Sequence, residues 1–105
     1  MKTSPDLAST TPPPATHETF EEFEQAARRR GITAVLERRW PADTVLAEHT
    51  HDFAASALLV QGRMWLTVGA ATRELGPGDR FELDAGTEHA ERYGSEGATY
   101  WVARR

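Results

Sequence analysis

A series of short apolar and β-branched segments constrains the fold of this chain more than any other feature. It begins at Ile32 and continues to the C-terminus, and turn-forming residues interrupt it at a spacing typical of β-sandwiches and β-barrels. We expect turns at Gly62 and at 94–97, among others. The predicted strands are 32–40, 45–51, 56–61, 63–68, 72–75, 80–83, 89–93 and 98–103. The pattern therefore predicts an all-β domain with little room for helices.

Side chains alternate along these predicted strands, as the segment 63–68 illustrates. Met64 and Leu66 share one face and Trp65 lies on the other, so one face meets a core and the other is directed outward. A closed barrel suits so short a domain because it leaves few strand edges exposed. Trp65 and Trp101 both fall on the outward face, and two large outward aromatic side chains indicate a homodimer.

The 105 residues are enough for one domain, which we place at 17–105. Residues 1–16 are rich in Thr, Ser and Pro and offer little to bury, so we interpret them as a disordered or extended tail. Between this tail and the first strand, Thr19 can cap a short amphipathic helix whose third residue is Glu22 and which ends before Gly31. We expect this helix to cover an open end or an edge of the barrel.

Charge and composition exclude several classes of function. The chain has 12 basic and 16 acidic residues and a net charge of −4, which is no basis for binding nucleic acid or anionic lipid. Its N-terminal segment is polar and lacks the apolar run of a signal sequence or membrane span, so we expect a cytoplasmic protein without a membrane partner. The chain has no cysteine, which leaves histidine and oxygen atoms as the metal ligands available to it.

Two histidines, His49 and His51, are separated by one residue on a predicted strand. Their side chains are then expected to point the same way, with Cα atoms roughly 6.6 Å apart, a separation that two imidazoles can close around one ion. Val45 and Ala47 share their parity, so this face is predicted to be directed inward and Leu46 outward. A pair of this kind is a weak signal by itself, because solvated histidines or histidines buried in a core also produce it.

The second half of the chain strengthens the signal. There the run from Gly78 to His89 has the order glycine, five residues, Asp-Ala-Gly, two residues, histidine. Together with the histidine pair, it resembles the two motifs of the cupin superfamily. The matching residues are His49, His51, Gly62, Gly78, Gly86 and His89. The resemblance implies a small single-domain cupin, a β-barrel of the double-stranded β-helix or jelly-roll type with one short N-terminal helix. It also implies a metal held by the three histidines.

The chain departs from the superfamily pattern at several positions. Ala55 and Ser56 stand where the motif glutamate belongs, Asp84 replaces the proline of the second motif, and Tyr93 replaces an asparagine. The chain thus resembles the three-histidine variants of the superfamily, which include iron-dependent thiol dioxygenases, and also members that have lost tight metal binding. Ser56 remains a candidate for a role beside the metal, although it is short and neutral.

Three neutral imidazoles favour Fe, Zn, Ni or Cu over Mn, and three protein ligands leave a position for water or substrate. Glu91 has the parity of His89 and could be a substitute ligand or could accept a hydrogen bond from a ligand histidine. We favour the simpler interpretation that Glu91 is a solvated glutamate at the barrel rim. Tyr93 also has this parity and could donate to a bound substrate, although an aromatic residue near a strand end more often belongs to a core or an interface.

Three functions are compatible with these features. The first is a metal-dependent enzyme with oxygenase, isomerase or hydrolytic activity on a small organic molecule, for which the sequence assigns no catalytic residue. The second, ranked almost equal, is a non-enzymatic cupin that binds or senses a small ligand. The third is a dimeric barrel with a vestigial metal site.

Overall fold

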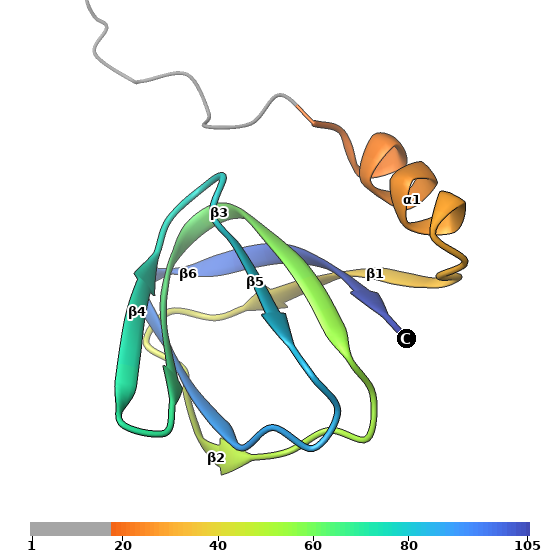
Figure 1. The fold of residues 1–105 in the computed structure, drawn as a ribbon. Helices are drawn as coiled ribbons and strands as arrows, with labels where there is room; N and C mark the ends of the chain where they lie inside the picture. The colour runs from red at the N-terminus through yellow and green to blue at the C-terminus, as the bar shows by residue number, and fades with distance from the viewer. Residues whose placement is uncertain (1–17) are drawn as a thin grey trace, which may run out of the picture.

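The computed structural model describes residues 18–105, which form one helix and a six-stranded antiparallel sheet (Figure 1). Residues 1–17, including the expected tail, lie outside the described residues. The elements are α1 (Phe20–Arg29), β1 (Ala34–Trp40), β2 (Val45–His49), β3 (Ala55–Val68), β4 (Ala71–Leu75), β5 (Arg80–Leu83) and β6 (His89–Arg104). The predicted all-β class with one short N-terminal helix is confirmed. Within the described range, no helix has the length and apolarity that crossing a bilayer requires.

Two long strands, β3 and β6, organise the barrel. They pair with each other along most of their length and bend together, so that each contributes to both halves of the fold (Figure 1). In one half, 98–104 of β6 pairs with β1 and 55–58 of β3 pairs with β5. In the other half, the start of β6 pairs with β2, and 64–68 of β3 pairs with β4. The sheet therefore closes around one interior, and both halves contribute side chains to it.

Two glycines allow the long strands to continue through positions where the sequence predicted turns. Gly62 has φ +84°, and a Cβ there would lie 2.1 Å from the carbonyl oxygen of Gly97. Gly97 has φ +70°, and a Cβ there would lie 2.3 Å from the carbonyl oxygen of Trp40. The pairing of β3 with β6 is irregular here, because Gly62 of β3 lies opposite Ala98 of β6 whereas Met64 lies opposite Tyr93. The turn predictions at Gly62 and 94–97 were wrong because glycine with positive φ serves a strand irregularity as well as a turn.

Apolar side chains form two clusters, one inside the barrel and one beneath α1. The interior cluster contains Ala57, Leu59, Met64, Leu66, Leu75, Phe81, Leu83, Tyr93, Ala98, Tyr100 and Val102. The second cluster joins Phe23, Ala27 and Ile32 to Leu58 and Ala103 on the outer face of the sheet. The helix therefore packs on an outer face of the barrel, over residues of β3 and β6, and not over an open end or an edge as we expected.

This position of α1 changes the interpretation of Trp101. Its indole ring lies 5.6 Å from the ring of Phe20 and 5.9 Å from that of Phe23, measured between centroids. Its Nε1–H donates to a carboxylate oxygen of Glu37 at 3.0 Å. Trp101 does point out of the barrel, but the helix packs against it. The outward alternation alone could not distinguish a partner subunit from a segment of the same chain.

The start of α1 provides a stability prediction. The backbone N–H of Glu22 donates to Thr19 Oγ1 at 3.1 Å, and the backbone N–H of Thr19 donates to Glu22 Oε1 at 2.9 Å, which confirms the expected cap. Thr19→Ala should lower the free energy of unfolding by about 1 kcal/mol, because it removes an acceptor from the first turn. Chemical denaturation checks this value, with the exposed helix position Gln25→Ala as the control. An unchanged midpoint for Thr19→Ala would contradict it.

Candidate metal centre

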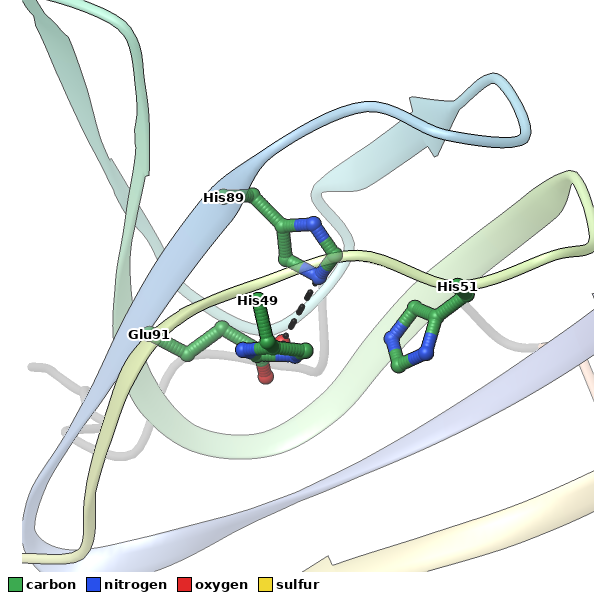
Figure 2. A group of neighbouring side chains, drawn as sticks. All are labelled: His49, His51, His89 and Glu91. Atoms are coloured by element: carbon green, nitrogen blue, oxygen red, sulfur yellow. Dashed lines mark ion pairs between the residues drawn. The ribbon is translucent and has the colours of Figure 1, made fainter.

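The three predicted histidines converge inside the barrel (Figure 2). His49 ends β2, His51 lies in the segment that follows, and His89 begins β6 directly opposite His49 in the strand register. The ring centroids of His49 and His89 are 4.4 Å apart, and the ring of His51 is 5.0 Å from each of the other two. Together with Glu91 they form a group whose ligand atoms all lie within 4.8 Å of one another.

The convergence of His49 and His51 does not arise from simple alternation along β2. Val45 is 68% exposed, whereas Leu46 and His49 line the interior, so the predicted inward direction of Val45 and Ala47 was wrong. The reason is an irregularity in the pairing of β2 with β6 between Leu46 and His49, which reverses the parity. His51 lies beyond the strand, where its carbonyl oxygen accepts a hydrogen bond from the backbone N–H of Gly86 at 2.8 Å. This bond joins the two sequence motifs.

Backbone carbonyls orient two of the imidazoles. Nδ1 of His49 lies 2.7 Å from the carbonyl oxygen of Ala47, and Nδ1 of His89 lies 2.9 Å from that of Thr87. A carbonyl oxygen can only accept, so each Nδ1 carries the proton and each neutral ring keeps its lone pair on Nε2. The two Nε2 atoms lie 3.6 Å and 3.3 Å from Oε2 of Glu91. This arrangement is the one that metal-ligating histidines use.

Burial and electrostatics also fit a metal centre. His89 is 1% exposed, and its Nε2 has no hydrogen-bond partner among the described residues, which is uncommon for a buried polar atom. Burial lowers the pKa of His51, and the neighbouring His89 and His49 lower it further. His51 is therefore neutral near pH 7, as a metal ligand must be. The buried Nε2 of His89 therefore makes no hydrogen bond within the described residues, and it lies beside the carboxylate of Glu91, so both groups could bind one cation.

Glu91 is the residue whose environment the sequence interpretation missed. It is 6% exposed, so the preferred interpretation as a solvated glutamate at the rim was wrong. The available signal was its parity with His89, two residues earlier on β6. Its carboxylate stands beside the histidines even though the first motif lacks its glutamate (Figure 2). The donor set is therefore three imidazoles and one carboxylate.

Tyr93 holds this carboxylate in place. Its hydroxyl donates to Oε1 of Glu91, which leaves Oε2 directed at the imidazoles. Burial raises the pKa of Tyr93, and the nearby Tyr100 and Glu91 raise it further, so the hydroxyl remains a donor at all ordinary pH values. The indole of Trp40 stacks on the Tyr93 ring with centroids 5.4 Å apart. Tyr93 thus lies behind Glu91 in the core, 1% exposed, which agrees with the core alternative considered for it and not with a role in donating to a substrate.

Ser56 lies apart from the metal group. It lines depressions on the other side of β3, next to Glu82 and Ala103, whereas its neighbour Ala55 lines the interior cavity. The role beside the metal that we considered for Ser56 therefore does not fit the structure. Of the two residues at the position of the motif glutamate, Ala55 is the one that reaches the interior.

The histidines and Glu91 line a cavity of about 110 Å³. Its remaining wall is largely apolar and aromatic, formed by Trp40, Leu46, Phe53, Phe81, Leu83, Tyr100 and Val102, among others. Arg38 and Arg104 also reach it. A small cavity with apolar walls and a few convergent polar groups is the usual form of a small-molecule site.

Comparison with known proteins agrees with this fold. No protein-family model and no curated protein matches the sequence. Among solved structures, a protein of unknown function from Rhizobium leguminosarum has a TM-score of 0.63 at 20% identity, over 67% of this chain and 66% of its own. A single-substitution variant of oxalate decarboxylase from Bacillus subtilis has a TM-score of 0.61 at 20% identity, over 67% and 20%. An RmlC-like cupin from Shewanella frigidimarina has a TM-score of 0.59 at 16% identity, over 67% and 63%.

The chain spans less than two thirds of the length of each of these three proteins. At such low identity the likeness concerns the fold alone. The chain therefore has the cupin fold, as its histidine and glycine motifs predicted. Its interior holds a His/His/His/Glu group that could bind a metal ion.

Proposed function

We propose that this cupin-fold protein is a metal-dependent enzyme that acts on a small organic molecule, with His49, His51, His89 and Glu91 as the metal ligands. The observation that carries the proposal is the convergence of these donor atoms on the wall of a cavity, with Nε2 of His89 buried and without a hydrogen-bond partner among the described residues. A divalent ion bound there would act as a Lewis acid toward an oxygen atom of a bound molecule.

Other residues of the chain orient the proposed ligands and shape the cavity. Ala47 and Thr87 orient the imidazoles of His49 and His89 through their carbonyl oxygens, and Tyr93 orients Glu91. A ligand that fills the cavity would displace water from its largely apolar wall, which strengthens electrostatic interactions inside. A small organic molecule in the cavity would therefore be held beside the donor group in a site of low dielectric constant.

Other cupin-fold structures support an enzymatic role. Structures similar to this chain include oxalate decarboxylase from Bacillus subtilis, DMSP lyases, and the polyketide cyclase RemF from Streptomyces resistomycificus. The names of these proteins denote different reactions. The shared fold therefore does not indicate whether this chain has oxygenase, isomerase or hydrolytic activity. We propose the enzyme class from the donor group and leave the reaction open among these three.

The ion that we propose is a divalent transition metal. Iron, zinc, nickel and copper suit the imidazoles, and Glu91 adds a negatively charged oxygen that the three-histidine interpretation lacked. We expected manganese to be disfavoured because the first motif lacks its carboxylate. Glu91 supplies a carboxylate, so this reason no longer applies. Elemental analysis of protein purified without a histidine tag tests the proposal, and we expect about one ion per chain. Protein that remains free of metal and fails to take up any of these ions would refute it.

A binding or sensing module is the second candidate function, and one observation favours it. Glu91 is the sole acidic residue on the cavity wall among the described residues, and Tyr93 already occupies one of its oxygens. The wall therefore offers no separate carboxylate as a general base. Mass spectrometry of ligands incubated with metal-loaded protein distinguishes the two functions. A ligand that binds and is recovered unchanged favours the sensing module, and a converted ligand favours the enzyme.

We also propose that the chain forms a homodimer through the face that carries Trp65. This half-buried indole lies beneath the guanidinium of Arg92, 3.9 Å from the ring centroid, and Val45 of β2, which pairs with Arg92 on its other side, is 68% exposed. Light scattering at micromolar concentration should give twice the chain mass of 11.7 kDa. Val45→Glu should shift the mass toward the monomer, whereas Ala71→Glu at an exposed position should not. A monomeric wild-type protein would contradict this prediction.

A further inference from the structure

Two arginines in the cavity have no role in the metal centre. Arg38 of β1 and Arg104 of β6 both line the cavity that holds the histidine group. Among the described residues, neither guanidinium forms an ion pair, whereas Arg28, Arg39, Arg63 and Arg80 each pair with a glutamate. In addition, Nε of Arg104 is buried and has no hydrogen-bond partner within the described part of the chain. A buried guanidinium nitrogen without an acceptor requires an explanation.

Strand geometry directs both side chains to the interior. On β6 the residues Tyr100, Val102 and Arg104 alternate with residues that face α1, and all three line the cavity. On β1, Arg38 lies opposite Tyr100 in the strand register. Both guanidinium groups therefore reach the cavity from neighbouring strands, because the alternation of the barrel places them there.

Aromatic rings support both guanidinium groups. The Arg104 guanidinium carbon lies 4.4 Å from the centroid of the Phe53 ring, and that of Arg38 lies 4.8 Å from the Trp40 ring. Stacking of this kind holds the planar group by its face and leaves its N–H edge available to an acceptor. The two cations are therefore held in position before any ligand binds.

The charge of the cavity is opposite to that of the chain. The whole chain carries −4, yet the cavity wall has two arginines and one carboxylate, and a bound divalent ion would make it more positive. Such a cavity attracts an anion. Guanidinium groups match carboxylates through two parallel hydrogen bonds. The cavity, of about 110 Å³, is small, which favours a small anion.

We propose that the ligand of this cavity is a small organic carboxylate, bound by its carboxylate group to Arg104, with Arg38 as a second cationic contact. The inference rests on the proposed function for the placement of the other end of the ligand beside the metal centre. The carboxylate accepts hydrogen bonds from the guanidinium of Arg104, which has no ion-pair partner among the described residues and whose Nε has no acceptor there. A singly charged carboxylate fits better than a doubly charged phosphate, because Glu91 adds a negative charge to the same wall.

Isothermal titration of metal-loaded protein with acetate, glycolate and pyruvate tests the inference, with acetamide, glycolamide and inorganic phosphate as comparison ligands. At least one carboxylate should bind, and its uncharged amide should bind much more weakly. Arg104→Gln should reduce the carboxylate affinity by roughly 10- to 100-fold, as expected for the loss of a charge-assisted hydrogen bond. Arg105→Gln is the matched control, because it makes the same charge change at an exposed neighbour outside the cavity.

Two further variants keep the test decisive if Arg104→Gln is poorly folded. Arg104→Lys retains the charge and should retain part of the affinity. Arg38→Gln should also weaken binding, whereas Arg39→Gln on the outer surface should not. Equal losses in Arg104→Gln and Arg105→Gln, equal binding of amide and carboxylate, a preference for phosphate, or no carboxylate binding would each overturn the inference.

Metal content separates this inference from the proposed function. Arg104→Gln should retain the same metal content as wild type, because Arg104 is not among the donor group. Protein that binds carboxylates through Arg104 but takes up no metal would refute the proposed enzyme and support the carboxylate site. Protein that takes up metal but shows no preference for carboxylates would refute the carboxylate site and leave the proposed metal-dependent function standing.

Discussion

The His51→Ala variant should lose most of the bound divalent ion. His51 contributes one of four converging donors, and it is the one that lies in a loop. Loss of a residue that only supports a ligand typically reduces metal affinity by roughly 10 to 100-fold, so loss of the ligand itself should cost more. Calorimetric titration of metal-stripped protein measures the change.

The control for His51→Ala is Thr50→Ala, an exposed neighbour whose loss should leave the affinity unchanged. The metal-free variant should melt within a few degrees of metal-free wild type, because His51 is only partly buried and lies outside the strands. Wild-type affinity in His51→Ala would remove His51 from the donor group. Failure of wild type to bind any divalent ion would refute the metal centre as a whole.

The Glu91→Gln variant should show the second large loss of metal affinity. Glutamine has nearly the same shape, and its amide oxygen can still accept the hydroxyl of Tyr93, so the change removes mainly the negative charge. We expect a loss greater than the roughly 10 to 100-fold typical of a supporting residue. The loss should be larger for manganese and iron than for zinc, because the former depend more on oxygen ligands.

Titration of Glu91→Gln with each metal in turn measures both effects. Glu88→Gln is the matched control, because it makes the same chemical change at an exposed residue. If Glu91→Gln binds each ion as tightly as wild type while His51→Ala does not, the centre consists of three histidines alone. That result would restore the original expectation that manganese is disfavoured.

The sequence was sufficient to predict the fold and the convergence of the histidines. The spacing of apolar segments and turns predicted an all-β domain, and the resemblance of the motifs to those of cupins implied the barrel and placed His49, His51 and His89 in one site. These features are local or depend on the repeating geometry of strands. They could therefore be read without knowing which strands pair.

The errors share a different cause, because each depended on contacts between distant segments. The irregularity in β2 that turns Val45 outward requires the register with β6, and the close approach of Gly62 to Gly97 requires the pairing of β3 with β6. The burial of Glu91 depends on Tyr93 and on the closure of the barrel around it. The contact of Trp101 with α1 depends on where the helix packs. None of these follows from residue type and spacing alone.

The position of β2 has a consequence for the lifetime of a bound ion. Among the described strands, this five-residue strand pairs with β6 alone, yet it carries His49 and leads directly to His51. Half of the four donors therefore belong to an edge segment, whereas His89 and Glu91 lie on the longest strand. Detachment of β2 from β6 would separate the donors and leave the rest of the barrel intact. We therefore expect local opening of one short strand, which requires less free energy than global unfolding, to set the exchange rate of an ion bound here.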